Sequence, residues 1–165
     1  MLFQTPRLII RNLHINDAIP FHEMEGNANV MRYVSGKVTT FEEDKSELIK
    51  LINYYQKPDN GFWVWAIERK SDNVFVGTSA IIVDDKNEGE IGCRFLEKYW
   101  GNGFGSEVAE ALIQYGLNEM KLKAMYAYVD ILNVASVKIL EKTSLEFIRE
   151  EWNEEEQCTD RFYKK

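Results

Sequence analysis

The chain has few of the residues on which metal-stabilised or disulfide-linked domains depend. Its 165 residues include 2 cysteines, 2 histidines and 3 prolines. Cys93 and Cys158 lie far apart and form no C-x-x-C pair, so we expect two reduced thiols and neither a zinc site nor a disulfide framework. His14 and His22 lie away from other potential ligands. We therefore predict no metal site.

Long apolar runs and an excess of positive charge are also absent. No stretch approaches the roughly 20 apolar residues that cross a bilayer, and the N-terminus has no signal-peptide pattern. The formal net charge of −7 argues against a surface for nucleic acid, because such surfaces carry an excess of Lys and Arg. We expect a cytoplasmic protein that binds neither nucleic acid nor membrane.

Hydrophobic residues make up 45% of the chain, which predicts one domain with its own core over residues 1–165. The order of elements favours a mixed α/β fold, because strands and helices neither alternate strictly nor separate. The predicted strands are 7–13, 62–68, 74–83, 90–96, 124–129, 145–152 and 161–165. Five helices are predicted. The first begins after Asp17, the second is 27–34, the third runs from Thr40 to Lys57, the fourth follows the segment 99–105 and ends at Met120, and the fifth is 133–142.

The C-terminal strands give two further expectations. The acidic residues between 150 and 156 are predicted to form a solvated turn between the last two strands. We expect the strand 161–165 to lie at an edge of the sheet, where unpaired backbone groups can bind a second copy. A homodimer is a hypothesis that follows from this edge.

A glycine-rich turn precedes a helix in YWGNGFGSEVAEAL, residues 99–112. The first N–H groups of a helix have no acceptor within it, and partial positive charge gathers there. Glycines at 101, 103 and 105 let the backbone bend tightly and let an anion reach those N–H groups. The pattern predicts a diphosphate site, with a plain flexible turn as the structural alternative.

Two other nucleotide-binding motifs compete for these glycines. Their spacing is similar to the dinucleotide fingerprint G-x-G-x-x-G, with Asp130 where a ribose-binding acid would lie. The third glycine comes one position early, however, and too few residues follow Asp130 for a second nucleotide-binding half. A nicotinamide-dependent enzyme is therefore disfavoured. A P-loop is excluded, because no Lys-Ser/Thr pair follows the turn.

Residues 90–142 resemble the coenzyme A-binding half of the GNAT N-acetyltransferases, most closely the branch that acetylates the N-termini of ribosomal proteins. The segments that carry the resemblance are YWGNGFGSE (99–107), NVASVKILEK (133–142), TPRLIIRNLHINDA (5–18) and VMRYVSG (30–36). The resemblance implies a three-layer fold, in which a central, mostly antiparallel sheet splays between the fourth and fifth strands and helices cover both faces. It also implies acetyl-CoA as the acetyl donor.

The resemblance further implies where coenzyme A binds. The N–H groups of Asn102 through Ser106 would hold its diphosphate, and backbone groups around Phe95 and Leu96 would pair with the pantetheine arm in the splayed sheet. Asn133 would contact the same arm. The implied cofactor-binding residues are Phe95, Leu96, Gly101, Asn102, Gly103, Phe104, Gly105, Ser106 and Asn133.

Two side chains are candidates for the acetyl transfer itself. A primary amine is mostly protonated near neutral pH, so a base must take its proton, and Glu90 is our candidate. A solvent-exposed glutamate at a strand end is the structural alternative. Strand N–H groups near Phe95 would polarise the thioester oxygen. The resemblance puts Ser136 beside the leaving sulfur, whereas its structural alternative is a serine that helps to cap the helix.

The predicted function is acetyl-CoA-dependent acetylation of a primary amine on a small molecule or a protein N-terminus. A non-catalytic coenzyme A-binding module is the alternative. Tyr33, Trp63 and Trp65 could line the acceptor site, although core packing is favoured for the two tryptophans. The chain departs from the family at residues 143–145, where a glycine usually ends the helix, so either Ser144 adopts a positive φ or the helix ends differently.

Overall fold

The strands form one mixed, eight-stranded sheet in the computed structural model, which describes residues 2–165. Their spatial order is β1-β2-β3-β4-β5-β6-β8-β7. All neighbouring pairs in this part of the chain are antiparallel except β5 and β6. The predicted α/β class is therefore confirmed. The strands are β1 Phe3–Gln4, β2 Leu8–Asn12, β3 Phe62–Arg69, β4 Val74–Val83, β5 Gly89–Phe95, β6 Met125–Asp130, β7 Glu146–Asn153 and β8 Cys158–Lys164.

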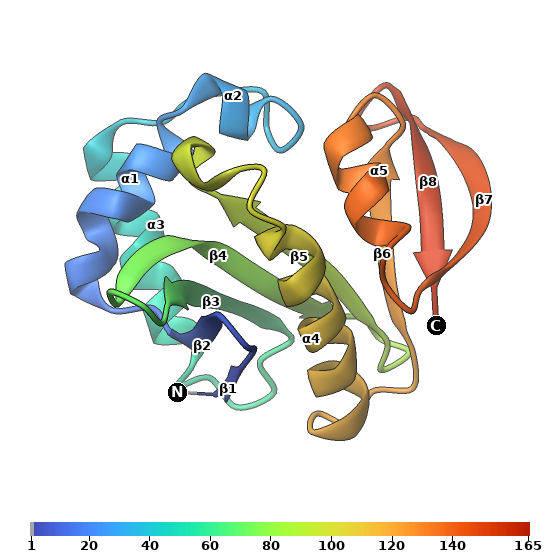
Figure 1. Ribbon diagram of the computed structural model, residues 1–165, viewed down its shortest axis with the longest axis horizontal. Helices are drawn as coiled ribbons and strands as arrows, with labels where there is room; N and C mark the ends of the chain where they lie inside the picture. The colour runs from blue at the N-terminus through green and yellow to red at the C-terminus, as the bar shows by residue number, and fades with distance from the viewer. Residues whose placement is uncertain (1) are drawn as a thin grey trace.

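Helices cover both faces of the sheet and make three layers (Figure 1). Strand residues alternate between the faces, so Ala66 of β3 packs in one core while its neighbours Trp65 and Ile67 pack in the other. On the Ala66 side lie α1 (Ala18–Glu25), α2 (Ala28–Met31) and α3 (Phe41–Tyr54), and on the Trp65 side lie α4 (Phe104–Asn118) and α5 (Val134–Leu140). Two short 3-10 helices, η1 (Ile15–Asp17) and η2 (Glu97–Tyr99), precede α1 and α4.

The sheet splays between β5 and β6. Gly89 lies opposite Met125 and Glu90 lies opposite Tyr126, and beyond Glu90 the two strands diverge (Figure 1). Gly89 permits the close approach at the start, because a Cβ there would lie 2.7 Å from Cδ1 of Leu122. These strands are the fourth and fifth of the sequence prediction, so the predicted splay is confirmed.

Four helices end earlier than the sequence predicts: α2 at Met31 and not at residue 34, α3 at Tyr54 and not at Lys57, α4 at Asn118 and not at Met120, and α5 at Leu140 and not at residue 142. After Tyr54 the N–H groups of residues 55–57 donate to carbonyls three residues back, so the α-helical bonding of α3 stops although the chain keeps turning to Lys57. The side chain of Tyr55 joins two neighbouring segments. Its hydroxyl accepts from the N–H of Leu13 at 3.0 Å and donates to the carbonyl of Val64.

α5 lacks the glycine that usually ends this helix, and it ends without a residue of positive φ at Ser144. The helix ends at Leu140, and Ser144 has no positive φ. The N–H and hydroxyl of Ser144 instead donate to the carboxylate of Glu110 on α4, at 2.7 and 3.0 Å. A side chain from another helix thus replaces the backbone turn that a glycine would make.

The C-terminal strand lies inside the sheet and not at its edge. β8 pairs with β6 on one side and with β7 on the other, so the edge position predicted for residues 161–165 is wrong. The homodimer hypothesis depended on an unpaired edge at residues 161–165, and the structure does not have that edge. The acidic turn is confirmed for residues 154–156, which are exposed between β7 and β8, whereas Glu150 and Glu151 belong to β7.

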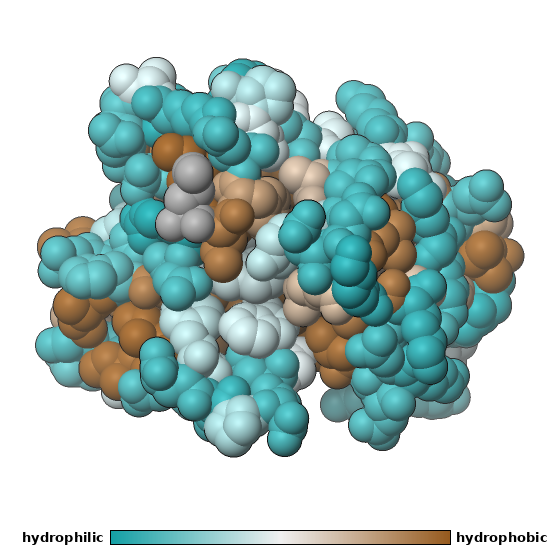
Figure 2. Space-filling model, turned by 90° about the horizontal axis from the view of Figure 1, so that it is seen from below, coloured by the Kyte–Doolittle hydropathy of each residue, from teal (hydrophilic) through white to brown (hydrophobic). Residues whose placement is uncertain are grey.

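Hydrophilic residues make up most of the face seen in Figure 2. Hydrophobic side chains occur there in separate patches, divided by hydrophilic ones. None of the helices formed by residues 2–165 has the length and apolar character needed to span a membrane. The fold places its main apolar surfaces between the layers.

Candidate active site

The turn before α4 presents a row of backbone N–H groups that have no acceptor. Within residues 2–165, none of the N–H groups from Gly101 to Ser106 makes a hydrogen bond. Gly101 and Gly103 have φ of +76°, in the left-handed region, which costs a residue with a side chain about 1–2 kcal/mol. Gly103 is also the N-cap of α4. Free N–H groups at the positive end of a helix dipole form a binding site for an anion.

Gly105 serves a different purpose from the other two glycines. Its φ is not positive, but a Cβ added to it would lie 2.4 Å from Cδ1 of Ile139 on α5. Glycine at this position therefore allows the start of α4 to contact α5. As a result, the start of α4 lies against the last turn of α5, the helix that begins after Asn133.

The side of β5 that faces β6 has unpaired backbone groups beyond the splay. Backbone groups alternate in direction along a strand, and the N–H of Leu96 points toward β4, where it donates to the carbonyl of Val76 at 3.0 Å. The N–H groups of Cys93 and Phe95 point the other way, toward the side that β6 has left. Leu96 therefore has no free N–H, and this part of the prediction is wrong. The N–H groups of Cys93 and Phe95 are the free donors on this side of β5.

Asn133 and Ser136 lie together in the first turn of α5. Asn133 is the N-cap, and its Oδ1 accepts from the backbone N–H of Ser136 at 3.2 Å. Neither the Ser136 hydroxyl nor the Asn133 side-chain NH₂ group makes a hydrogen bond to the residues described. The cap is thus built by Asn133 alone. Both polar groups are available to a ligand beside the splayed strands.

Glu90 lies at the point where β5 and β6 separate. It points to the same face as Arg94, which binds Glu25 of α1, so its side chain lies on the face of the sheet opposite α4. The carboxylate is half-buried and has no hydrogen-bond partner among residues 2–165. Burial, together with the charge of Asp160, raises the pKa of Glu90 above its usual range. Such a carboxylate is a stronger base than an exposed one.

Aromatic side chains continue this face of the sheet from Glu90 onto β6 and β8. Tyr126, Tyr128 and Phe162 contact one another, and the rings of Tyr128 and Phe162 are stacked with centroids 4.7 Å apart. Asp160, on the same face of β8, is only 7% exposed. Aromatic faces and carboxylates both attract cations, so this surface suits an amine.

The three aromatic residues predicted near the acceptor site lie in two places. Trp65 is 1% exposed and stacks on Trp63 at a centroid distance of 6.0 Å, in the core beneath α4, which confirms core packing for both tryptophans. Tyr33 lies after α2, and its hydroxyl donates to the carbonyl of Leu132 at 3.0 Å. This contact joins the segment after α2 to the loop before α5, across the splay.

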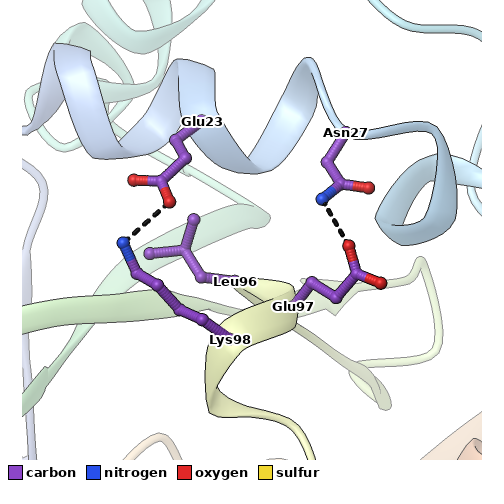
Figure 3. Close-up of a pocket in the computed structure, with 5 residues that line it drawn as sticks. All are labelled: Glu23, Asn27, Leu96, Glu97 and Lys98. Carbon is purple, nitrogen blue, oxygen red and sulfur yellow. Dashed lines mark hydrogen bonds and ion pairs between the residues drawn. The ribbon is translucent and has the colours of Figure 1, made fainter.

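A shallow pocket of about 370 Å³ lies between α1 and η2 (Figure 3). Its polar side chains already bind one another: Glu23 pairs with Lys98 at 2.7 Å, and Asn27 donates to Glu97 at 2.8 Å. These two pairs therefore hold η2, which precedes the glycine-rich turn, against α1 and the start of α2. Its lining residues are Glu23, Asn27, Leu96, Glu97 and Lys98.

Sequence reasoning missed residues that act across long separations. Arg7 contacts Glu107 at the start of α4, and Asp160 acts on Glu90 from another strand. The segments around Arg7 and Glu107 are both among those that carry the family resemblance. No spacing rule within either segment, however, shows that the two side chains meet.

Comparisons with known sequences identify the family. Residues 7–146 match the family model of the acetyltransferase (GNAT) domain. The chain is 31% identical over 157 residues to the uncharacterized protein YkkB of Bacillus subtilis (strain 168), covering 90% of this chain and 88% of that protein. It is 28% identical over 144 residues to the uncharacterized N-acetyltransferase p20 of Bacillus licheniformis, covering 86% and 80%. The chain belongs to the GNAT acetyltransferase family.

Solved structures share the fold. An acetyltransferase of the GNAT family from Bacillus anthracis superposes with a TM-score of 0.85 at 24% identity, over 98% of this chain and 96% of that one. A spermidine N-acetyltransferase from Vibrio cholerae, solved in complex with CoA and spermine, has a TM-score of 0.78 at 20% identity, over 94% of each chain. The protein is thus a GNAT-type N-acetyltransferase. Membership of the branch that acetylates ribosomal proteins stays a prediction.

Proposed function

We propose that the protein transfers an acetyl group from acetyl-CoA to a primary amine on a small molecule or a peptide N-terminus. The observation that carries this proposal is the row of unpaired N–H groups from Gly101 to Ser106. Adjacent phosphates offer several acceptor oxygens and negative charge, which match consecutive N–H groups at a helix N-terminus. The CoA complex of the Vibrio cholerae enzyme supports the same donor here.

The pantetheine arm of the donor would lie along β5. The N–H groups of Cys93 and Phe95 would bind it as they would bind a neighbouring strand, and the free side-chain NH₂ of Asn133 would contact it from α5. When bound, acetyl-CoA supplies an acetyl group that is activated as a thioester. The N–H of Cys93 or of Phe95 would donate to the oxygen of that group as negative charge develops on it.

Glu90 and Ser136 would handle the proton and the leaving group. Glu90 would accept the proton that the attacking amine must lose, directly or through water. The hydroxyl of Ser136, which the helix cap does not use, would donate a hydrogen bond to the sulfur that leaves. No direct contact joins Glu90 to Ser136 among the residues described, and the reacting groups would lie between them.

The surface around Glu90 favours a small cationic amine as the acceptor. Tyr126 and Tyr128 provide aromatic rings, whereas the Phe162 ring already contacts Tyr128 and the guanidinium of Arg149, 4.4 Å from its centroid. Asp160 provides a second carboxylate. The Vibrio cholerae neighbour is a spermidine N-acetyltransferase solved with spermine, which supports a polyamine as the first acceptor to test.

The test is an acceptor screen in which the release of free thiol from acetyl-CoA is measured. Polyamines, aminoglycosides and peptides with free N-termini should be compared at equal concentrations, and we expect the fastest release with a polyamine. Release with peptides alone would overturn the choice of acceptor class. If no amine releases thiol while CoA binds tightly, the catalytic proposal itself is wrong.

Ser136→Ala tests the role of the hydroxyl. We expect kcat to fall by about tenfold, because a hydrogen bond to a charged group contributes about 1.5–3 kcal/mol. The dissociation constant of CoA should stay within about twofold, since the cap formed by Asn133 uses only the backbone of Ser136. Steady-state kinetics and calorimetric titration with CoA measure the two quantities.

Ser46→Ala is the matched control, because the Ser46 hydroxyl bonds only to a carbonyl of its own helix, that of Glu42 at 2.8 Å. It should keep the kcat of the unaltered protein. An equal kcat in Ser136→Ala would show that the hydroxyl takes no part in the transfer.

A further inference from the structure

The start of α4 is fastened to the beginning of the chain by one arginine. The guanidinium of Arg7 donates through Nε to Oε2 of Glu107 at 2.7 Å and through Nη1 to the carbonyl of Asn102 at 2.9 Å. It also lies over the ring of Phe104, 4.7 Å from the ring centroid. The Arg7 side chain is 50% exposed, so its charge reaches the surface beside the unpaired N–H groups.

The contact with Asn102 fixes the direction of one peptide group in the turn. In a planar trans peptide the C=O and the following N–H point in opposite directions. Because Arg7 holds the carbonyl of Asn102, the N–H of Gly103 must point away from the guanidinium. Gly103 is the N-cap of α4, with φ of +76°, and its N–H belongs to the unpaired row.

The negative charge of Glu107 lies close to the proposed anion site, and Arg7 balances it. Glu107 lies in the first turn of α4, where its negative charge would repel a bound anion. Although burial opposes ionisation, hydrogen bonds from Thr5 and Arg7 hold the pKa of Glu107 below its usual range, so the carboxylate is charged. The salt bridge at 2.7 Å from Nη2 of Arg7 balances that charge.

We infer that Arg7 is a positioning residue for the diphosphate of CoA, acting through the carbonyl of Asn102 and the carboxylate of Glu107. This inference rests on the proposed function. Arg7 orients the Asn102–Gly103 peptide for phosphate binding and cancels the one negative side chain in the first turn of α4. The pantetheine arm and the acceptor amine lie outside its reach in this scheme, so its effect is confined to the diphosphate.

Arg7→Gln tests this role with two acetyl donors. We expect the KM for acetyl-CoA and the dissociation constant of CoA to rise about tenfold, while kcat stays within about twofold. S-acetylpantetheine carries no phosphate, so its kcat/KM should be the same in the variant and in the unaltered protein. Arg7→Lys keeps the charge but loses the bidentate geometry, and it should restore only part of the affinity.

A double-mutant cycle separates positioning from general support of the fold. In a Glu107→Gln background no negative charge remains for Arg7 to balance, so the loss caused by Arg7→Gln should shrink to about threefold. Arg161→Gln is the control, because Arg161 pairs with Glu141 and Glu150 away from this turn. It removes an arginine from ion pairs of the same kind and should leave the affinity for CoA unchanged.

The outcomes are distinguishable. If Arg7→Gln binds CoA as well as the unaltered protein, or loses activity equally with acetyl-CoA and S-acetylpantetheine, the positioning role is wrong while the proposed function stands. If the unaltered protein does not bind CoA, the proposed function fails and this inference fails with it. A selective loss with the phosphate-bearing donor supports the inference.

Discussion

Replacement of Glu90 by glutamine is expected to lower kcat/KM for the amine by about a hundredfold or more, since a positioned base contributes 10²- to 10⁴-fold. Glutamine keeps the size of the side chain but cannot take a proton. Affinity for CoA should change little, because Glu90 lies on the opposite face of the sheet from α4. Thiol release at saturating acetyl-CoA measures the loss.

The pH dependence of the reaction should report the environment of Glu90. The base acts when ionised, so kcat/KM rises with pH through its pKa. Burial and Asp160 raise that pKa, so the rise should occur above the range of an ordinary glutamate, about 4.3. Asp160→Asn removes a negative charge, stabilises the ionised form of Glu90 and should move the rise to lower pH. The amine's own titration is common to all variants and cancels in the comparison.

Glu154→Gln provides the control for these experiments, because Glu154 lies in the exposed turn between β7 and β8. It removes the same charge from the protein without touching the face that carries Glu90. Full activity in Glu90→Gln would assign proton removal to solvent water alone. A pH profile that Asp160→Asn does not move would show that the two carboxylates are uncoupled.

The sequence predicts those parts of the fold and site that depend on local pattern. The order of the helices and of strands β2 to β8 and the glycine-rich turn are encoded within short segments, and the structure has them. The splay between β5 and β6 was implied by the family resemblance, and the short strand β1 was not predicted. The Leu96 prediction is wrong, because the direction of each backbone N–H depends on pairing with β4, which the sequence does not specify. A strand's register therefore decides which backbone groups a ligand meets.

Contacts between distant segments set the remaining features, and no local pattern contains them. Ser144 needs no positive φ because Glu110 of α4 binds its N–H, and β8 is not an edge strand because it turns back from β7 and lies between β7 and β6. In the same way Arg7, which directly precedes β2, meets Glu107 of α4 only in the folded protein. The sequence contains each of these residues, but it does not show which distant residue each one contacts.

Gly103→Val is expected to weaken the binding of CoA by about tenfold to a hundredfold. Gly103 has φ of +76°, and a β-branched residue is strongly disfavoured there, by about 1–2 kcal/mol or more, so the turn must change shape. The change would rotate the Asn102–Gly103 peptide away from its contact with Arg7 and displace the N–H groups at the start of α4. Calorimetric titration with CoA measures the affinity, and thermal unfolding measures the cost to stability.

Gly36→Val separates the loss of binding from the general cost of a strained turn. Gly36 has φ of +66° with no atom within 4 Å of an added Cβ, and it lies in the segment after α2. Both valine variants should lose similar stability, because both force a β-branched residue into the left-handed region. Only Gly103→Val should lose affinity for CoA. Equal affinity in the two variants would mean that the unpaired N–H groups at the start of α4 are not where the diphosphate binds, and the acetyl-CoA site would have to be sought elsewhere on the sheet.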